Sequence, residues 1–162
     1  MIRHAHDPDA RAGAAPAVIR PLAPHEEPEV HAIHAACHPT FPPRPARWFE
    51  AHPTLVCEVA GAIVGYTSYS LVMYPEVSRE GEVMVGYGID IAPGRHGHGL
   101  GRALCDERLA LARALGAKAF LGHAAPDNHA MLRLFEQDGF KPYAEAAYPD
   151  GTPMLIFMGP VA

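Results

Sequence analysis

Three glycines at alternate positions, Gly97, Gly99 and Gly101, stand where an apolar strand gives way to a long helix rich in alanine and leucine. Because glycine has no Cβ, the backbone at these positions can approach a ligand closely, and the N–H groups of the first helical turn face that ligand without partners. The helix dipole adds a further attraction for anions. The spacing therefore predicts a cradle for a pyrophosphate.

The residues after this loop exclude two other kinds of nucleotide loop. Gly99-Leu100-Gly101 is followed by Arg102-Ala103-Leu104, so the chain has no Gly-x-Gly-x-x-Gly, and it has no Gly-Lys-Ser/Thr for a P-loop. A second block follows farther along the chain. It begins at Asn128 and ends in Leu134-Phe135-Glu-Gln-Asp-Gly139-Phe140.

Together the two blocks resemble the Gcn5-related N-acetyltransferase (GNAT) superfamily. Its acyl-CoA loop reads Gln/Arg-x-x-Gly-x-Gly/Ala, with His96, Gly99 and Gly101 on the fixed positions here, and its Asn-led helix ends in Leu-Tyr-Glu-x-x-Gly-Phe. His96 departs from that pattern. The resemblance implies a mixed, mostly antiparallel sheet of about seven strands, splayed between strands 4 and 5 and flanked by about four helices. It also implies transfer of an acetyl group from acetyl-CoA, as cosubstrate, to a primary amine by direct attack.

The resemblance further implies which residues hold acetyl-CoA. The backbone of residues 97–101 would hold the pyrophosphate, and the edge at Ile89 and Ile91 would hydrogen-bond pantetheine as an added strand does. Asn128 matches the residue that contacts the pantetheine arm, with helix capping as the alternative role. We expect His98 to face solvent. The predicted cofactor-binding residues are Ile89, Ile91, His96, Gly97, His98, Gly99, Leu100, Gly101, Arg102, Asn128 and Phe135.

The residue that protonates the departing thiolate is not evident. Phe135 stands where the family commonly has a tyrosine. Tyr143 or Tyr148 could replace it, as could water, since a thiolate is a fair leaving group; the alternative is that both tyrosines are half-buried sheet residues.

The base that deprotonates the amine is also open. Met84 and Val85 occupy the approximate positions of the glutamate that is common on the family's fourth strand. The candidates are Glu82, Asp90, Tyr87 or a chain of waters, and a carboxylate on a sheet face is often simply solvated. We therefore predict Tyr143, Glu82 and Asp90 as catalytic residues.

Histidines at helical spacing raise the question of a metal. His31, His34 and His38 share one helical face, with Cys37 nearby, but no carboxylate or second cysteine completes a four-ligand set. We predict no metal and expect this face to line the acceptor site or to be exposed. Besides the acetyltransferase, the patterns leave open a domain that binds acyl-CoA without catalysis, as a sensor or partner-binding module, and a histidine-bound metal protein.

Length and composition set the remaining expectations. The 162 residues suit one domain over 17–162, after a flexible N-terminal tail over 1–16. Three scattered cysteines argue against a disulfide framework. The start of the chain has no apolar signal stretch, and no run of about 18 apolar residues occurs, so we expect a cytoplasmic protein without a membrane partner.

The net charge and the scarcity of lysine argue against nucleic acid as a partner. The formal net charge is −5, and lysine occurs only at Lys118 and Lys141, so no basic stripe for nucleic acid exists. The expected partner is a small-molecule or protein amine, and a homodimer is possible.

The sequence also predicts the helices and strands. We expect strands from Val18 and over 55–60, 63–73, 82–92, 119–122, 140–148 and 154–158, and helices over 24–38, 44–50, 99–115 and 128–139.

Overall fold

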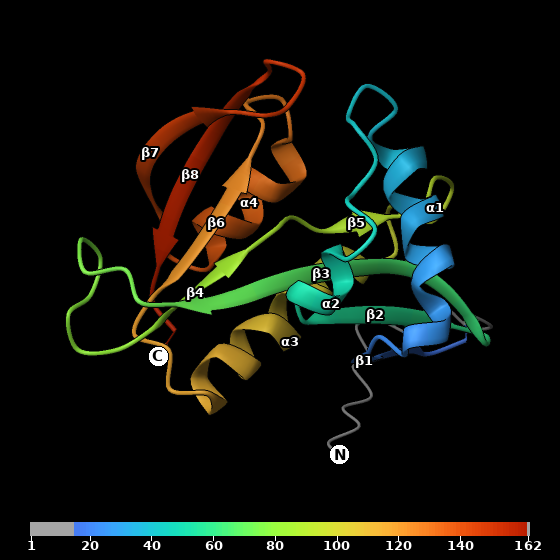
Figure 1. The fold of residues 1–162 in the computed structure, drawn as a ribbon, viewed down its shortest axis with the longest axis horizontal. Helices are drawn as coiled ribbons and strands as arrows, with labels where there is room; N and C mark the ends of the chain where they lie inside the picture. The colour runs from blue at the N-terminus through green and yellow to red at the C-terminus, as the bar shows by residue number, and fades with distance from the viewer. Residues whose placement is uncertain (1–14, 162) are drawn as a thin grey trace. The chain divides into compact units, whose positions relative to one another are not determined.

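The computed structural model describes residues 15–161, which fall into two compact units (Figure 1). One unit comprises the chain through Ser68 together with Ile89–Glu107, and the other comprises Tyr69–Gly88 together with residues 108–161. The tail predicted for residues 1–16 lies almost wholly outside the described residues. The predicted single domain over 17–162 stays a prediction.

The first unit is built on an antiparallel sheet in the order β1-β2-β3-β5. The strands are β1 (Ala17–Pro21), β2 (Thr54–Val59), the first part of β3 (Ala62–Val72) and the two-residue β5 (Asp90–Ile91). β2 and β3 form a hairpin, and their ranges agree with the strands expected over 55–60 and 63–73. Its turn places Ala60 at φ 51° and Gly61 at φ 80°, the left-handed pair that a tight hairpin with twisted strands requires.

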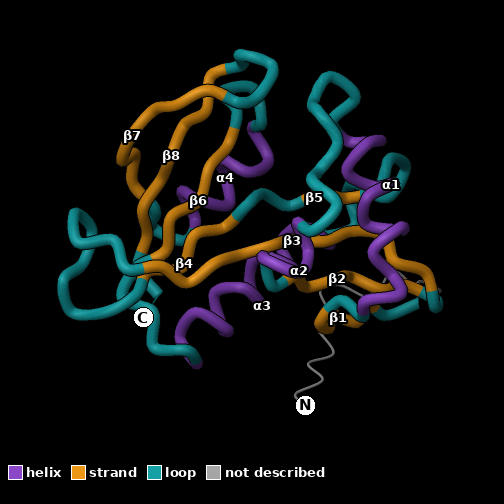
Figure 2. The backbone as a smooth tube through the Cα atoms, viewed as in Figure 1, coloured by secondary structure: helices purple, strands orange, loops and turns teal. Residues whose placement is uncertain are grey.

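Helical segments of this unit are η1 (Pro24–Glu26), α1 (Glu27–Cys37) and α2 (Trp48–Ala51), drawn in purple in Figure 2. In η1 and α1, prolines and acidic residues in the first turn favour helix initiation. α2 is shorter than the predicted 44–50 helix, because Pro45 lies in the turn before it. The core of the unit consists of Val30, Ile33, Phe49, Val56 and Tyr66.

Most strands of the second unit also pair antiparallel, in the order β3-β4-β6-β8-β7. The last residues of β3 pair with β4 (Val83–Gly86), and β4 pairs in parallel with β6 (Phe120–Ala124). β8 (Pro153–Gly159) and β7 (Lys141–Ala147) complete the sheet. The eight strands, mostly antiparallel, and the four α-helices of residues 15–161 confirm the predicted fold class.

The prediction of a single strand over 82–92 is wrong, because this segment forms two strands, β4 and β5 (Asp90–Ile91). Gly86 packs so closely that an added Cβ would lie 2.7 Å from Arg108 Nη1, and Gly88 adopts φ 85°. Arg108 Nη1 also donates a hydrogen bond to the Gly88 carbonyl at 3.2 Å. The buried guanidinium thus holds the backbone at Tyr87–Ile89 away from regular strand pairing, and the backbone at Gly86 approaches Arg108 closely.

The splay expected between the fourth and fifth predicted strands falls between β4 and β6. Their register pairs Met84 with Phe120 and Val85 with Leu121, and the recorded pairing stops there within the described residues. β6 continues to Ala124 with β8 on its other side. The strands therefore separate after two paired positions, as the resemblance implied.

Two longer helices follow their predicted ranges closely. α3 (Leu100–Ala114) is followed by Gly116 at φ 75°, whose N–H donates to Arg113 O, as glycine commonly does at the C-terminus of a helix. α4 (His129–Gln137) begins after Asn128.

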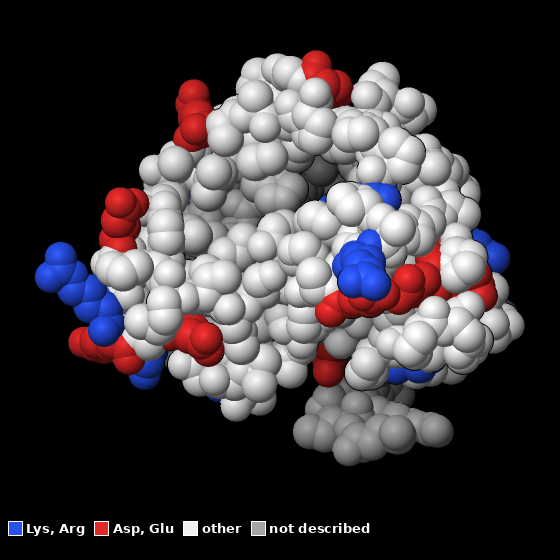
Figure 3. All heavy atoms as spheres, viewed as in Figure 1, with Lys and Arg blue, Asp and Glu red and all other residues white. Residues whose placement is uncertain are grey.

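In the part of the chain that the structure describes, no helix has both the length and the apolarity needed to cross a bilayer. Lys and Arg side chains appear singly on the face drawn in Figure 3, without gathering into one patch.

Candidate active site

The glycine loop leads directly into the N-terminus of α3. Gly97 and Gly99 adopt φ 80° and 73°, left-handed values that glycine accepts without strain. The Gly99 carbonyl accepts the first helical hydrogen bond from Ala103 N–H, at 3.0 Å. The amides of Leu100 and Gly101 precede Ala103, whose N–H makes this first bond, so they lie where the N-terminus of a helix binds an anion.

Space for a ligand exists at this loop. A Cβ added at Gly97 or at Gly101 would meet nothing within 4 Å. Residues 93–99 are exposed, whereas Leu100 is buried and anchors the start of the helix. The geometry thus provides an open, amide-lined surface that suits a diphosphate.

Three side chains near the loop carry positive charge or can acquire it. His96 is exposed, and His98 is exposed as expected. Arg102 forms an ion pair with Asp106 one turn along α3, at 2.5 Å, with both side chains about one third exposed. Its guanidinium is therefore held beside the helix N-terminus by a local partner.

The predicted pantetheine edge lies at β5. The Ile91 side chain is buried, and its carbonyl accepts a hydrogen bond from the Cys37 thiol at 3.2 Å. Ile89 is half-buried, just before the strand. The structure does not test the hydrogen bonds to pantetheine, which stay a prediction.

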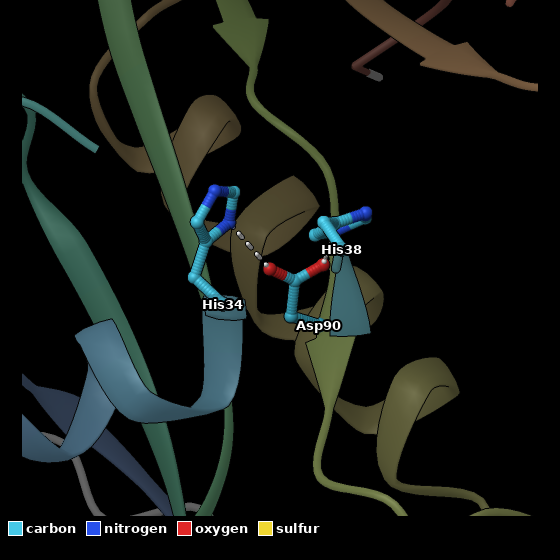
Figure 4. A group of neighbouring side chains, drawn as sticks. All are labelled: His34, His38 and Asp90. Carbon is cyan, nitrogen blue, oxygen red and sulfur yellow. Dashed lines mark hydrogen bonds and ion pairs between the residues drawn. The ribbon is translucent and has the colours of Figure 1, made fainter. Parts of the chain in front are cut away.

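Asp90 is not a solvated carboxylate on a sheet face, since it is 7% exposed and held by three donors. Figure 4 shows its two oxygens facing two histidine rings, one at the end of α1 and one just after it. Oδ1 lies 2.7 Å from His38 Nε2, and Oδ2 lies 3.4 Å from His34 Nδ1. The Tyr66 hydroxyl donates to Oδ2 at 2.8 Å.

These contacts decide the charge state of Asp90. Burial by itself would raise the pKa of this carboxyl, but hydrogen bonds from His34, His38 and Tyr66 and the charge of His38 outweigh it and hold the pKa well below its usual range. Asp90 is therefore an anion at neutral pH and a weak proton acceptor. Its predicted role as a base is not supported by this geometry.

The other two predicted catalytic residues, Glu82 and Tyr143, do not take part in the hydrogen bonds around Asp90. Glu82 is exposed just before β4. Tyr143 is exposed on the edge strand β7, where its side chain hydrogen-bonds Tyr74. No described contact of Glu82 or Tyr143 identifies a catalytic role, so both assignments stay predictions.

Tyr148, the alternative proton donor, has a more specific environment than Tyr143. Its hydroxyl lies 2.8 Å from Nδ1 of His123 on β6, and the rings meet edge to face. Burial raises the pKa of Tyr148 to about 12, so the hydroxyl keeps its proton at neutral pH. His123 also lies 3.8 Å from the position of a Cβ added at Gly88, in the break after β4. The pair therefore borders the separating strands of its unit.

Phe135 belongs to the core of the second unit. Its ring stacks on Phe140 and Phe157, with centroids 5.1 and 4.9 Å away, and it is 2% exposed. A Cβ at Gly122 would lie 2.8 Å from this ring. The described contacts are therefore those of a packed core residue, and the predicted contact with acetyl-CoA stays a prediction.

Asn128 performs the capping role that was one of its two expected roles. Its Oδ1 accepts a hydrogen bond from Met131 N–H at 3.2 Å, at the start of α4. Its contact with pantetheine stays a prediction.

Sequence reasoning missed two groups, the buried His34–His38–Asp90 cluster and the His123–Tyr148 pair. The helical spacing of His34 and His38 was visible, but the carboxylate between them comes from a strand 52 residues farther along the chain. His123 stands in an apolar strand, and the single polar residue there was the available signal.

Comparison with known proteins agrees with this geometry. A sequence model of the Acetyltransferase (GNAT) family matches residues 23–140. Mycothiol acetyltransferase from Geodermatophilus obscurus is 43% identical over 67 residues, which are 40% of this chain. The chain spans about a fifth (22%) of the length of that curated relative.

Solved structures share the fold at low identity. The ribosomal-protein-S18-alanine N-acetyltransferase of Escherichia coli superposes with a TM-score of 0.74 at 18% identity, over 90% of this chain and 94% of that one. Arabidopsis thaliana NAA60 in complex with acetyl-CoA gives a TM-score of 0.68 at 13% identity, over 88% and 97% of the two chains.

Proposed function

Because the chain belongs to the GNAT acetyltransferase family, we propose that it transfers the acetyl group of acetyl-CoA to a primary amine by direct attack. The observation that carries this proposal is the N-terminus of α3, where the amides of Leu100 and Gly101 and the open space beside Gly101 suit the pyrophosphate of CoA. The complex of NAA60 with acetyl-CoA supports the choice of cosubstrate.

The reaction replaces the C–S bond of the thioester by a C–N bond, and it requires two proton transfers, one from the ammonium and one to the thiolate. The amine nitrogen attacks the thioester carbonyl carbon, the C–N bond forms as the C–S bond breaks, and the CoA thiolate accepts a proton. Tyr148 is the better candidate for that proton than Tyr143, because its hydroxyl is protonated and held by His123. We assign removal of the ammonium proton to Glu82, Tyr87 or water, since three donors occupy Asp90.

The acceptor is proposed only as a class, an amine of a small molecule or of a protein. The E. coli neighbour is named for the alanine of a ribosomal protein, and the curated relative is named for mycothiol, so both kinds of acceptor occur among similar proteins. The cytoplasmic location and a homodimer stay predictions.

Thiol release from acetyl-CoA in the presence of an amine panel tests the proposal. The panel contains amino acids, polyamines, aminoglycosides and peptides with free N-termini, and free CoA is measured with a disulfide reagent. We expect release that depends on one amine class and on enzyme concentration. Binding of acetyl-CoA without release by any amine would contradict catalysis and favour the non-catalytic acyl-CoA-binding module.

A further inference from the structure

The cluster of His34, His38 and Asp90 has the composition of a metal site. We propose that these three side chains bind a divalent transition-metal ion of the zinc class, with the ring nitrogens and one carboxylate oxygen as ligands (Figure 4). This site goes beyond acetyl transfer. It also reverses the expectation of no metal, which rested on the lack of a carboxylate near the histidines in sequence.

The distances between the donor atoms suit one small ion. The three ligand atoms lie within 4.8 Å of one another. Bonds of about 2.0–2.1 Å in a tetrahedral site separate neighbouring ligand atoms by roughly 3.3 Å. With Asp90 Oδ2 as the ligand oxygen, His34 Nδ1 already lies 3.4 Å from it, whereas His38 Nε2, which lies 2.7 Å from the other oxygen Oδ1, must turn toward the ion. Each of these two nitrogens binds the ion in place of the proton that it shares with the carboxylate.

His38 can make that adjustment by sliding along the ring of Phe41, on which its imidazole stacks with the ring centroids 4.6 Å apart. It is the residue just beyond α1, with φ −130° and ψ 66°, and its side chain is 31% exposed. His34 precedes it by four residues on the same helix face, and their ring centroids are 5.0 Å apart. Two histidines at this spacing are a common way for a helix to present two nitrogens to one ion. The exposed side of His38 leaves room for a water as fourth ligand.

The surroundings of Asp90 are those of a supported ligand. The Tyr66 hydroxyl donates to Asp90 Oδ2 and fixes the carboxylate in one orientation, as outer hydrogen bonds do at metal sites. Tyr66 is itself 1% exposed, so this support is rigid. Arg44, the neighbouring cation, hydrogen-bonds Tyr66, so the tyrosine hydroxyl is shared between the carboxylate and the guanidinium.

Cys37 does not belong to the ligand set, although it is adjacent to His38. Its thiol donates to the Ile91 carbonyl at 3.2 Å. The donors are therefore two nitrogens and one carboxylate oxygen, a set typical of zinc and of its cobalt and iron analogues.

Calorimetric titration of the full chain with ZnCl2, after removal of metal with a chelator, tests the proposal. We expect one equivalent to bind with micromolar or tighter affinity. His38→Gln should weaken that binding at least about 100-fold, Asp90→Asn should do the same, and Tyr66→Phe should weaken it about 10-fold. CoCl2 should give the visible absorption of a tetrahedral ion in the wild type, and His38→Gln should abolish it.

The matched control is His31→Gln. His31 stands on the same helix but packs edge to face on Phe49, with ring centroids 4.9 Å apart, outside the cluster. Zinc affinity should be unchanged in this variant. His38 is partly exposed, so His38→Gln should fold like the wild type, as checked by circular dichroism. Absence of binding by the wild type, or equal binding by folded His38→Gln, would overturn the site, whatever the acetyl-transfer assay shows.

Discussion

Replacing Gly101 by valine separates ligand binding from folding more cleanly than any other change in the glycine loop. Gly101 has a helical backbone with open space at its Cβ position, so the fold should tolerate valine. Gly99, by contrast, has φ 73°, and a side chain there would strain the backbone itself. Valine at 101 should therefore weaken phosphate binding and leave the fold intact.

The size of the effect follows from the amides of Leu100 and Gly101 at the start of α3. A branched side chain beside them keeps a phosphate oxygen from at least one N–H, and a hydrogen bond to a charged group contributes about 1.5–3 kcal/mol. Affinity for CoA should then fall by about 10- to 150-fold, because each 1.4 kcal/mol is about a factor of ten. Calorimetric titration with CoA measures the effect.

Thermal unfolding of the same samples checks the fold. The control is Ala110→Val, which adds the same branching at an exposed position of α3, away from the loop. It should leave CoA affinity unchanged. A folded Gly101→Val protein that binds CoA as tightly as the wild type would refute the phosphate cradle, and with it the placement of acetyl-CoA.

Further substitutions and titrations test individual residues. Asn128→Ala should lower the free energy of unfolding by about 1 kcal/mol through loss of the cap, and an added loss of acetyl-CoA affinity by calorimetry would reveal the pantetheine contact. Phe135→Tyr should destabilise the protein by about 1–3 kcal/mol in chemical denaturation, because its hydroxyl enters an aromatic core; a gain in turnover would instead place the ring at the thiolate. If Tyr148 is the acid, turnover should stay level as pH rises past 10, since the donor loses its proton only near pH 12, and Tyr148→Phe should lower kcat at every pH. Cys37 should react slowly with disulfide reagents at pH 8 in the native protein and rapidly after denaturation, because its raised pKa keeps the thiolate scarce.

Local features of the chain were predictable because their causes are local. Glycine is the residue that accepts positive φ, so the loop at Gly97 and Gly99 and the end of α3 at Gly116 followed from residue type. The hairpin at Ala60–Gly61 followed for the same reason. Helix ends agreed to within a few residues, since prolines and capping side chains define them.

Features that depend on distant partners could not be predicted. The break between β4 and β5 depends on Arg108, which comes from the middle of α3 and whose target, the Gly88 carbonyl, has no signature in the sequence. Asp90 was predicted as a candidate base, and its enclosure could not be foreseen because the histidines that enclose it lie more than 50 residues earlier. For the same reason, the partner of Tyr148 was not apparent until β6 and the end of β7 were seen together.

The tight packing at Gly86 limits how this sequence can diverge. A methyl group there would meet Arg108 Cζ at 2.8 Å and Phe120 Cζ at 2.8 Å. The guanidinium also lies over the Phe120 ring, 4.7 Å from its centroid, so the two obstacles hold each other in place. Any larger residue at 86 thus has to follow earlier replacements at both 108 and 120. Among descendants of this chain, the three positions should change in a fixed order or stay together, and Gly86 should be the last of them to vary.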